Sequence, residues 1–185
     1  MSFEEIINKL KSKGILFESG LSEHEIENIE SFYNIVIPPD LNEFLSIAHP
    51  VSNNFINWRD MNENNVNIIR DRLNWPLEGM IFDIENNSFW YKQWGPKPDN
   101  IEEAIKICKK ELEKVPKLIP ICSHRYIPSE PSEVGNPVFS VYQTDIIYYG
   151  ENLTSYLEIE FNLKKHEDIN FGSIKDIRFW SELVS

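Results

Sequence analysis

The first 50 residues carry apolar side chains at the spacing of helices. Apolar residues recur three or four positions apart, which places them on one helical face, in the segments 2–14, 21–34 and 41–49. Ser22 and Glu25 stand at the positions of a capping box, in which each side chain bonds the backbone N–H of the other residue. We therefore predict three helices, the second of which has a buried stripe formed by Ile26, Ile29 and Phe32.

A double proline at residues 38 and 39 separates the second predicted helix from the third. Proline ends one element here and favours the first turn of the next, because the first turn needs no N–H donor. Pro50 marks the end of the third helix.

Beyond residue 50 the apolar runs become shorter, and most of them are typical of strands. We predict a strand at 54–60, a short helix at 62–73, and a β-hairpin over 79–94 that turns at residues 85–87. Asn100 has the position of an N-cap for a helix that continues to Leu112. Further strands are predicted at 117–127, 137–143 and 145–150, and further helices at 152–161 and 176–184.

Helices followed by a meander of strands with inserted helices predict the α+β class with a mainly antiparallel sheet. A length of 185 residues suits one domain, and 41% hydrophobic residues suffice for a packed core without metal or disulfide. The segment 128–137 has the composition of a loop within the sheet rather than of a domain boundary. We therefore predict a single domain, residues 1–185.

The net charge of −12 limits the partners of the protein. Nucleic-acid binding relies on Lys and Arg side chains that displace counterions from phosphates, so we expect no direct nucleic-acid ligand. An acidic surface attracts a basic protein and speeds its association. Acidity also keeps a protein soluble without any further role, and both interpretations stay open at this point.

The residues that hold metals and cofactors form no motif in this sequence. Cys108 and Cys122 lie in a predicted helix and a predicted strand, and neither belongs to a CxxC motif. The four histidines are scattered, and neither an HExxH nor a glycine-rich phosphate motif is present. We therefore expect no metal, no cofactor, and two buried thiols in a reducing compartment. The segment 1–14 predicts neither a signal peptide nor a membrane span, which favours a cytoplasmic location.

An enzyme hypothesis rests on His124 and Asp145. They match a catalytic base and its orienting carboxylate, with Ser123 or Ser140 as the nucleophile. The chain has no GxSxG motif, and Ser123 and His124 would point to opposite faces if both lay on one strand. We therefore predict no catalytic residues and keep a hydrolase as a remote alternative.

The residue types that anchor protein interfaces are Trp, Tyr and Arg. Trp94 lies in a turn-rich segment where exposure is expected, whereas Trp90 and Trp180 are predicted to be core residues. Arg125 pairs with Asp145 or Glu130 in one interpretation and meets a carboxylate of a partner in another. The candidate partner-binding residues are Trp58, Trp94, Arg125, Tyr126 and Asp145.

Several segments resemble the SUKH superfamily, the domain shared by fungal cell-wall-assembly regulators and bacterial toxin-immunity proteins. In the N-terminal half, LSEHEIENIESFYNIVIPPDLNEFLSIAHP resembles the acidic helix, proline elbow and FL helix of that family. In the C-terminal half, the matching segments are LIPICSHRYIP, GNPVFSVYQTDIIYYGENLTSYLEIEF and RFWSEL. The resemblance covers residues 21–184 and departs at 48–50, where the family often carries a glycine.

The resemblance implies a curved antiparallel sheet with helices packed on one side and a concave groove for a partner. It also implies a non-enzymatic binding domain, which in bacteria commonly neutralises a polymorphic toxin by docking on it. Together with the acidic composition, this favours a basic toxin such as a nuclease as the partner. A regulatory scaffold of the same fold, which binds a peptide or protein unrelated to toxins, is the alternative.

Overall fold

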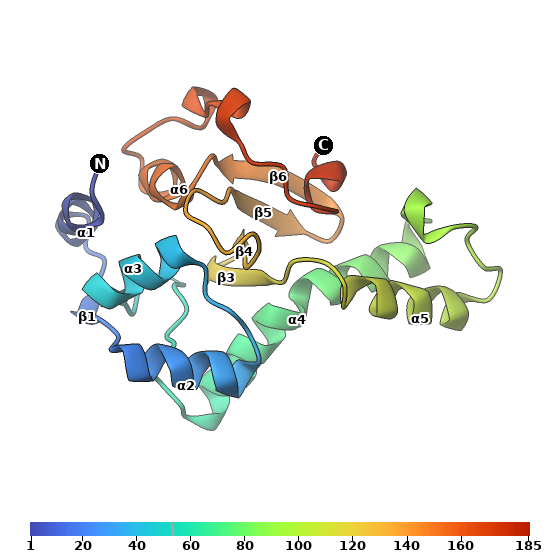
Figure 1. The fold of residues 1–185 in the computed structure, drawn as a ribbon, viewed down its shortest axis with the longest axis horizontal. Coiled ribbons are helices and arrows are strands. Elements are labelled where there is room, and N and C mark those ends of the chain that lie inside the picture. The colour runs from blue at the N-terminus through green and yellow to red at the C-terminus, as the bar shows by residue number, and fades with distance from the viewer. Residues whose placement is uncertain (53) are drawn as a thin grey trace.

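The three helices predicted in the first 50 residues are present in the computed structural model, which describes residues 1–52 and 54–185. They are α1 (Phe3–Ser12), α2 (Glu23–Tyr33) and α3 (Pro39–Ile47). Ser22 and Glu25 form the predicted capping box at the start of α2. The three helices lie together at one end of the molecule (Figure 1). Their apolar faces share one core that includes Ile6, Leu10, Ile29, Leu41 and Phe44.

A small two-stranded sheet joins this helical region and was not predicted. β1 (Phe17–Ser19) pairs antiparallel with β2 (Ala48–Pro50), which directly follows α3. The strand predicted at 54–60 is reduced to a single bridge between Phe55 and Cys122. These pieces are too short to show the alternation by which a strand is recognised in a sequence.

The hairpin predicted over 79–94 is wrong, because a long helix occupies the first half of this region. α4 runs from Glu63 to Asn86 over 24 residues and includes the segment predicted as a short helix. Pro76 lies in its interior, where a proline removes one N–H donor and usually kinks or ends a helix. After the 3₁₀ turn η1 (Lys92–Trp94), α5 (Ile101–Leu112) packs beside α4 (Figure 1).

Four antiparallel strands form the main sheet in the order β3-β4-β5-β6. β3 (Leu118–Cys122) and β4 (Arg125–Pro128) divide the single strand predicted at 117–127 into a hairpin. β5 (Val138–Tyr142), β6 (Asp145–Gly150) and the helix α6 (Leu153–Glu160) follow the prediction closely. The helix predicted at 176–184 contains only the 3₁₀ turn η4 (Ser181–Leu183). The fold is thus of the predicted α+β class with an antiparallel main sheet.

Helices pack on both faces of this sheet, whereas the SUKH resemblance implies helices on one side. Arg125 and Tyr126 are neighbours on β4, yet Arg125 pairs with Glu160 of α6 and Tyr126 bonds Arg72 of α4. On the α4 side, the sheet contributes Leu118, Phe139, Val141 and Ile146 to a core shared with α5 and the C-terminal segment. Both faces of the sheet thus contribute side chains to cores shared with helices.

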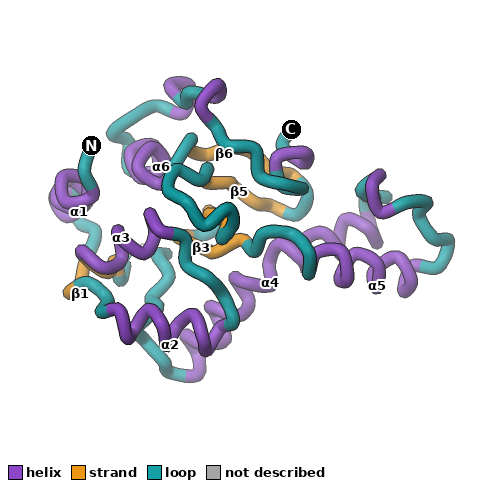
Figure 2. The backbone as a smooth tube through the Cα atoms, in the orientation of Figure 1, coloured by secondary structure: helices purple, strands orange, loops and turns teal. Residues whose placement is uncertain are grey.

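Loop segments also cover parts of the two edges of the sheet (Figure 2). Beside β3, the backbone N–H of Ile56 donates to the carbonyl of Ile121 at 3.1 Å. Beside β6, Val184 forms a parallel bridge with Ile146, and the N–H of Ser185 donates to the carbonyl of Ile146 at 3.2 Å. The sheet is thus an internal scaffold that positions the elements around it.

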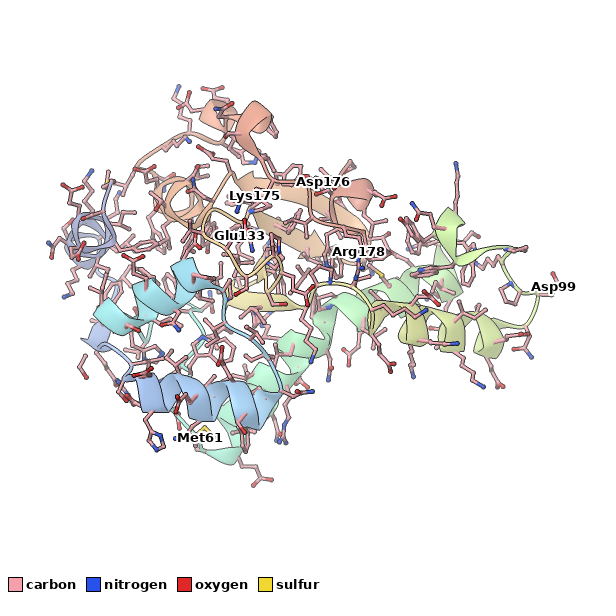
Figure 3. All side chains as sticks on the ribbon, viewed as in Figure 1. Met61, Asp99, Glu133, Lys175, Asp176 and Arg178 are labelled. Atoms are coloured by element: carbon pink, nitrogen blue, oxygen red, sulfur yellow. The ribbon has the colours of Figure 1, made fainter. Side chains whose placement is uncertain are left out.

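An ion pair between Glu133 and Lys175, 3.2 Å long, joins the loop after β4 to the C-terminal segment (Figure 3). The Lys175 ammonium also donates to the carbonyl of Val134 at 2.6 Å. Lys175 thus ties the C-terminal segment to the loop after β4.

Candidate docking site

Ser123 and His124 form the tight turn between β3 and β4, so the assumption that they lie on one strand is wrong. Ser123 has a left-handed backbone with φ of 51°, and its hydroxyl lies 3.1 Å from Nδ1 of His124. The other ring nitrogen, Nε2, contacts the guanidinium of Arg125. Burial and this neighbouring cation lower the pKa of His124, which makes the ring a weak base.

Asp145 does not complete a catalytic triad with His124. It is exposed at the start of β6 opposite Tyr142, and its carboxylate accepts a hydrogen bond of 3.4 Å from the hydroxyl of Ser185. His124 contacts a cation where a triad needs a carboxylate. The geometry therefore gives the hydrolase hypothesis no support.

Arg125 is held in a network of side chains rather than presented to solvent. Its Nε donates to Glu160 at 3.1 Å and its Nη1 donates to the hydroxyl of Ser140 at 2.7 Å. Its guanidinium lies 3.7 Å from the ring centroid of Tyr149, and its side chain is only 11% exposed. Neither predicted acidic partner is the one found, because α6 folds back over the sheet and brings Glu160 to this position. Arg125 thus stabilises the packing of α6 against the sheet.

Two further candidates, Trp58 and Tyr126, have buried side chains, and only Trp58 also lines the hollow described below. Tyr126 is fully buried, and its hydroxyl donates to the carbonyl of Arg72 at 2.9 Å. Trp58 is almost fully buried and packs edge-on against Tyr33, with ring centroids 5.8 Å apart. Large aromatic side chains dominate cores because they remove the most apolar area from water, which explains why both are buried.

Trp94, the fifth candidate, is half-buried in a cluster of aromatic rings. It stacks on Phe179 with ring centroids 6.0 Å apart and meets Trp90 edge-on at 5.2 Å. This cluster connects the segment between α4 and α5 to the C-terminal segment. Trp180 is buried as predicted, whereas Trp90 is only partly buried.

A hollow of about 480 Å³ lies between α2 and the loop that leads into α4. Ile29 and Phe32 line it from α2, and Trp58, Arg59 and Met61 line it from the loop. Phe32 and Met61 remain 47% and 50% exposed, and Met61 lies beside α2 in Figure 3. Exposed apolar side chains around a concave surface are typical of binding sites. This hollow is therefore the candidate docking site.

Arg59 fixes the shape of the hollow. Its Nε donates to Glu25 at 2.7 Å, and its Nη1 donates to Glu18 at 2.8 Å. Its Nη2 donates to the carbonyls of Ser19 and Gly20, each at 3.1 Å. These bonds join the end of β1, the start of α2 and the loop. Because every nitrogen of the guanidinium is engaged, Arg59 serves the structure and does not attract an acidic ligand.

The same contacts leave the rim of the hollow negative. Hydrogen bonds from Arg59 and then from Ser22 lower the pKa of Glu25 to about 2, so this carboxylate is ionised near neutral pH. Glu18 and Glu25 share one guanidinium, and their side chains are still 49% and 37% exposed. Two accessible carboxylates around one engaged cation favour a positively charged ligand.

His49 positions the backbone of Trp58, one of the residues that line the hollow. It is fully buried, and its Nε2 accepts a hydrogen bond of 3.2 Å from the backbone N–H of Trp58. Burial, and then the charge of Arg59, lower the pKa of His49. The ring therefore stays neutral at pH 7, and the bond positions the backbone at Trp58.

Reasoning from the sequence missed this hollow because it assigned Phe32 to the buried stripe of α2. The stripe consists of Ile26 and Ile29, with Tyr33 half-buried next to it, whereas Phe32 is exposed and lines the hollow. Ile26 and Tyr33 are seven positions apart, which matches two helical turns. This spacing could have indicated that Tyr33, and not Phe32, continues the stripe. The pairing of Arg59 with Glu18 and Glu25 had no local signal.

Comparisons with known proteins found no relative of this chain. Models of protein families, curated proteins and solved structures gave no match. Within residues 1–52 and 54–185, no group of His, Cys, Asp or Glu side chains is arranged to hold a metal ion, and no helix has the length and apolarity to cross a bilayer. The SUKH resemblance therefore stays a prediction, and the function has to be inferred from the hollow and its charge.

Proposed function

We propose that this protein is a non-enzymatic protein-binding domain that docks on a basic partner, as a bacterial immunity protein does when it neutralises a toxin. The observation that carries the proposal is the hollow beside α2, which is lined by exposed Phe32 and Met61 and by Glu25. Glu18 shares the guanidinium of Arg59 with Glu25. Aromatic and Met side chains are enriched at the centres of protein interfaces, and polar groups surround them.

The charge of the chain supports the same proposal. The net charge is −12, and α2 carries four Glu residues and no Lys or Arg. A toxin that cleaves nucleic acid has to expose Lys and Arg to hold phosphates, and these are the side chains that an acidic domain attracts. Docking over such a surface blocks the toxin by occlusion, without a catalytic step.

Co-expression with the protein encoded beside this chain tests the proposal. We expect that this neighbouring protein inhibits growth when expressed alone, and that co-expression relieves the inhibition. The two purified proteins should form a complex that weakens between about 50 mM and about 200 mM salt, because the attraction between exposed charges is screened.

Two other outcomes decide between the alternatives. A complex with a basic neighbour that has no effect on growth would favour the regulatory scaffold over the immunity protein. If the neighbouring protein neither binds this chain nor has its toxicity relieved, the immunity proposal is wrong.

A further inference from the structure

We propose that the hollow receives one apolar side chain from a basic segment of the partner, with an adjacent Lys or Arg that pairs with Glu18 or Glu25. This inference rests on the proposed function and specifies the chemistry of the segment that docks.

The apolar part of the inference comes from the lining of the hollow. Ile29 and Phe32 lie one helical turn apart on α2 and face the loop that carries Met61. The volume of about 480 Å³ falls within the range of about 300–1,000 Å³ in which sites bury a ligand. Met61 is unbranched and flexible, so it adapts to side chains of different shape. An inserted aliphatic or aromatic side chain would remove Phe32 and Met61 from water.

The inference that the docking segment is basic comes from the distribution of charge around the hollow. Arg70 of α4 already lies over the ring of Phe32, at 5.3 Å from the centroid. That face of the ring is therefore occupied by a cation from the protein itself. Glu25 in the lining, and Glu18, which pairs with the same Arg59, remain accessible. A cation of the partner is thus directed to these two carboxylates.

The same charges argue against other occupants. Segments 21–34 and 56–71, which surround the hollow, together contain seven acidic and two basic residues. This excess repels the phosphates of a nucleic acid. A second copy of the chain would bring the same acidic segments face to face across a twofold axis, where like charges oppose association. A basic protein segment is the occupant that matches both the apolar lining and the charge.

Synthetic peptides test this chemistry on the full-length protein by calorimetric titration. The first peptide carries one Leu between pairs of Lys, the second replaces Leu by Ser, and the third replaces each Lys by Glu. We expect the first to bind and the other two to bind at least about tenfold more weakly, since burying a Leu contributes about 1.5–3 kcal/mol. Equal binding of the Leu and Ser peptides, or no binding of the Leu peptide, would overturn the inference.

Variants show whether the peptide occupies the hollow. Met61→Arg and Asn28→Arg each place a cation in the lining, because both residues border the hollow. Phe82→Arg is the matched control, because Phe82 is 46% exposed and lies in the C-terminal half of α4. We expect both hollow variants to lose at least about tenfold in affinity, and the control to bind like wild type. Unchanged melting temperatures confirm that the variants fold, and Asn28 is exposed, so its replacement disturbs no core.

The outcomes separate this inference from the proposed function. If the neighbouring protein binds Met61→Arg and Asn28→Arg as tightly as wild type, the hollow is not the docking site, although the proposed function stands. If the neighbouring protein fails to bind wild type while the Leu peptide still binds in the hollow, the proposed function fails and the assignment of the hollow stands. A dimer in sedimentation that Met61→Arg dissociates would show that a second copy fills the hollow, which also overturns the inference.

Discussion

The hydroxyl of Tyr126 donates a hydrogen bond of 2.9 Å to the carbonyl of Arg72, four residues before Pro76 in α4. In an α-helix this carbonyl accepts from the N–H of residue 76, which proline lacks. A residue of the sheet therefore supplies the donor that the helix is missing. The bond explains how α4 continues through a proline, and it gives the buried hydroxyl of Tyr126 a partner.

This relationship predicts a coupling between Tyr126 and Pro76. Tyr126→Phe should lower the free energy of unfolding by about 1–2 kcal/mol, because it leaves a buried carbonyl without a donor. In a Pro76→Ala background, the backbone N–H of the new alanine supplies that donor, so the same change should cost less than half as much. Urea denaturation of wild type, the two single variants and the double variant measures this coupling as a difference in unfolding free energy. Equal costs of Tyr126→Phe in both backgrounds would contradict the interpretation.

Arg125 is predicted to affect stability rather than partner binding. Arg125→Ala removes a partly buried ion pair with Glu160 and should lower the free energy of unfolding by about 2–4 kcal/mol. Arg178→Ala is the control, since this arginine is exposed and a loss of less than about 1 kcal/mol is expected. The measurement is chemical denaturation. If Arg125→Ala keeps its full stability but no longer binds the partner, Arg125 belongs to the docking surface and this prediction is wrong.

Glu25 should contribute stability that depends on pH. Its pKa falls from the ordinary 4.5 to about 2 in the folded protein, so its stabilising effect is complete above pH 4.5 and is lost as the pH falls towards 2. Glu25→Gln should therefore melt below wild type at pH 7, and the difference should shrink between pH 4.5 and pH 2. Glu27→Gln, on the same helix, should stay within about 0.5 kcal/mol of wild type at pH 7. A difference that is as large at pH 2 as at pH 7 would disprove the assignment.

Asp83 is predicted to stabilise the turn between β5 and β6. Its Oδ2 accepts from the backbone N–H of Thr144 at 2.9 Å and from the hydroxyl of Thr144 at 2.5 Å. Asp83→Ala leaves these donors without an acceptor and should cost about 2–3 kcal/mol of unfolding free energy. Asp71→Ala, an exposed change on the same helix, is the control. Thermal unfolding measures both, and similar melting temperatures for the two variants would contradict the role of Asp83.

The elements that could be predicted from the sequence are those whose causes are local. Ser22 and Glu25 lie three residues apart and specify the start of α2 by themselves. Pro76 shows the opposite case, because its tolerance depends on Tyr126, which lies on a strand far along the chain. The wrong hairpin at 79–94 came from the turn-forming residues 85–87, which in fact stand where α4 ends. The turn at Ser123 was missed because a serine with positive φ has no strong sequence signature.

The candidate site was harder to predict than the fold. Residue type alone selected Trp58 and Tyr126, but the same apolar area that makes these side chains good anchors also places them in the core. The hollow depends on Arg59, whose partners Glu18 and Glu25 lie 41 and 34 residues away. Contacts of this kind are set by packing between elements, so no spacing rule in one segment reveals them.

The bridge between Val184 and Ile146 has a consequence for self-association. An edge strand with unpaired backbone groups is a template for another chain and a starting point for aggregation. Here the last residues occupy part of the β6 edge, and Ile56 occupies part of the β3 edge. Part of each edge of the main sheet is therefore already paired. We expect this pairing to disfavour the addition of a strand from another copy of the chain.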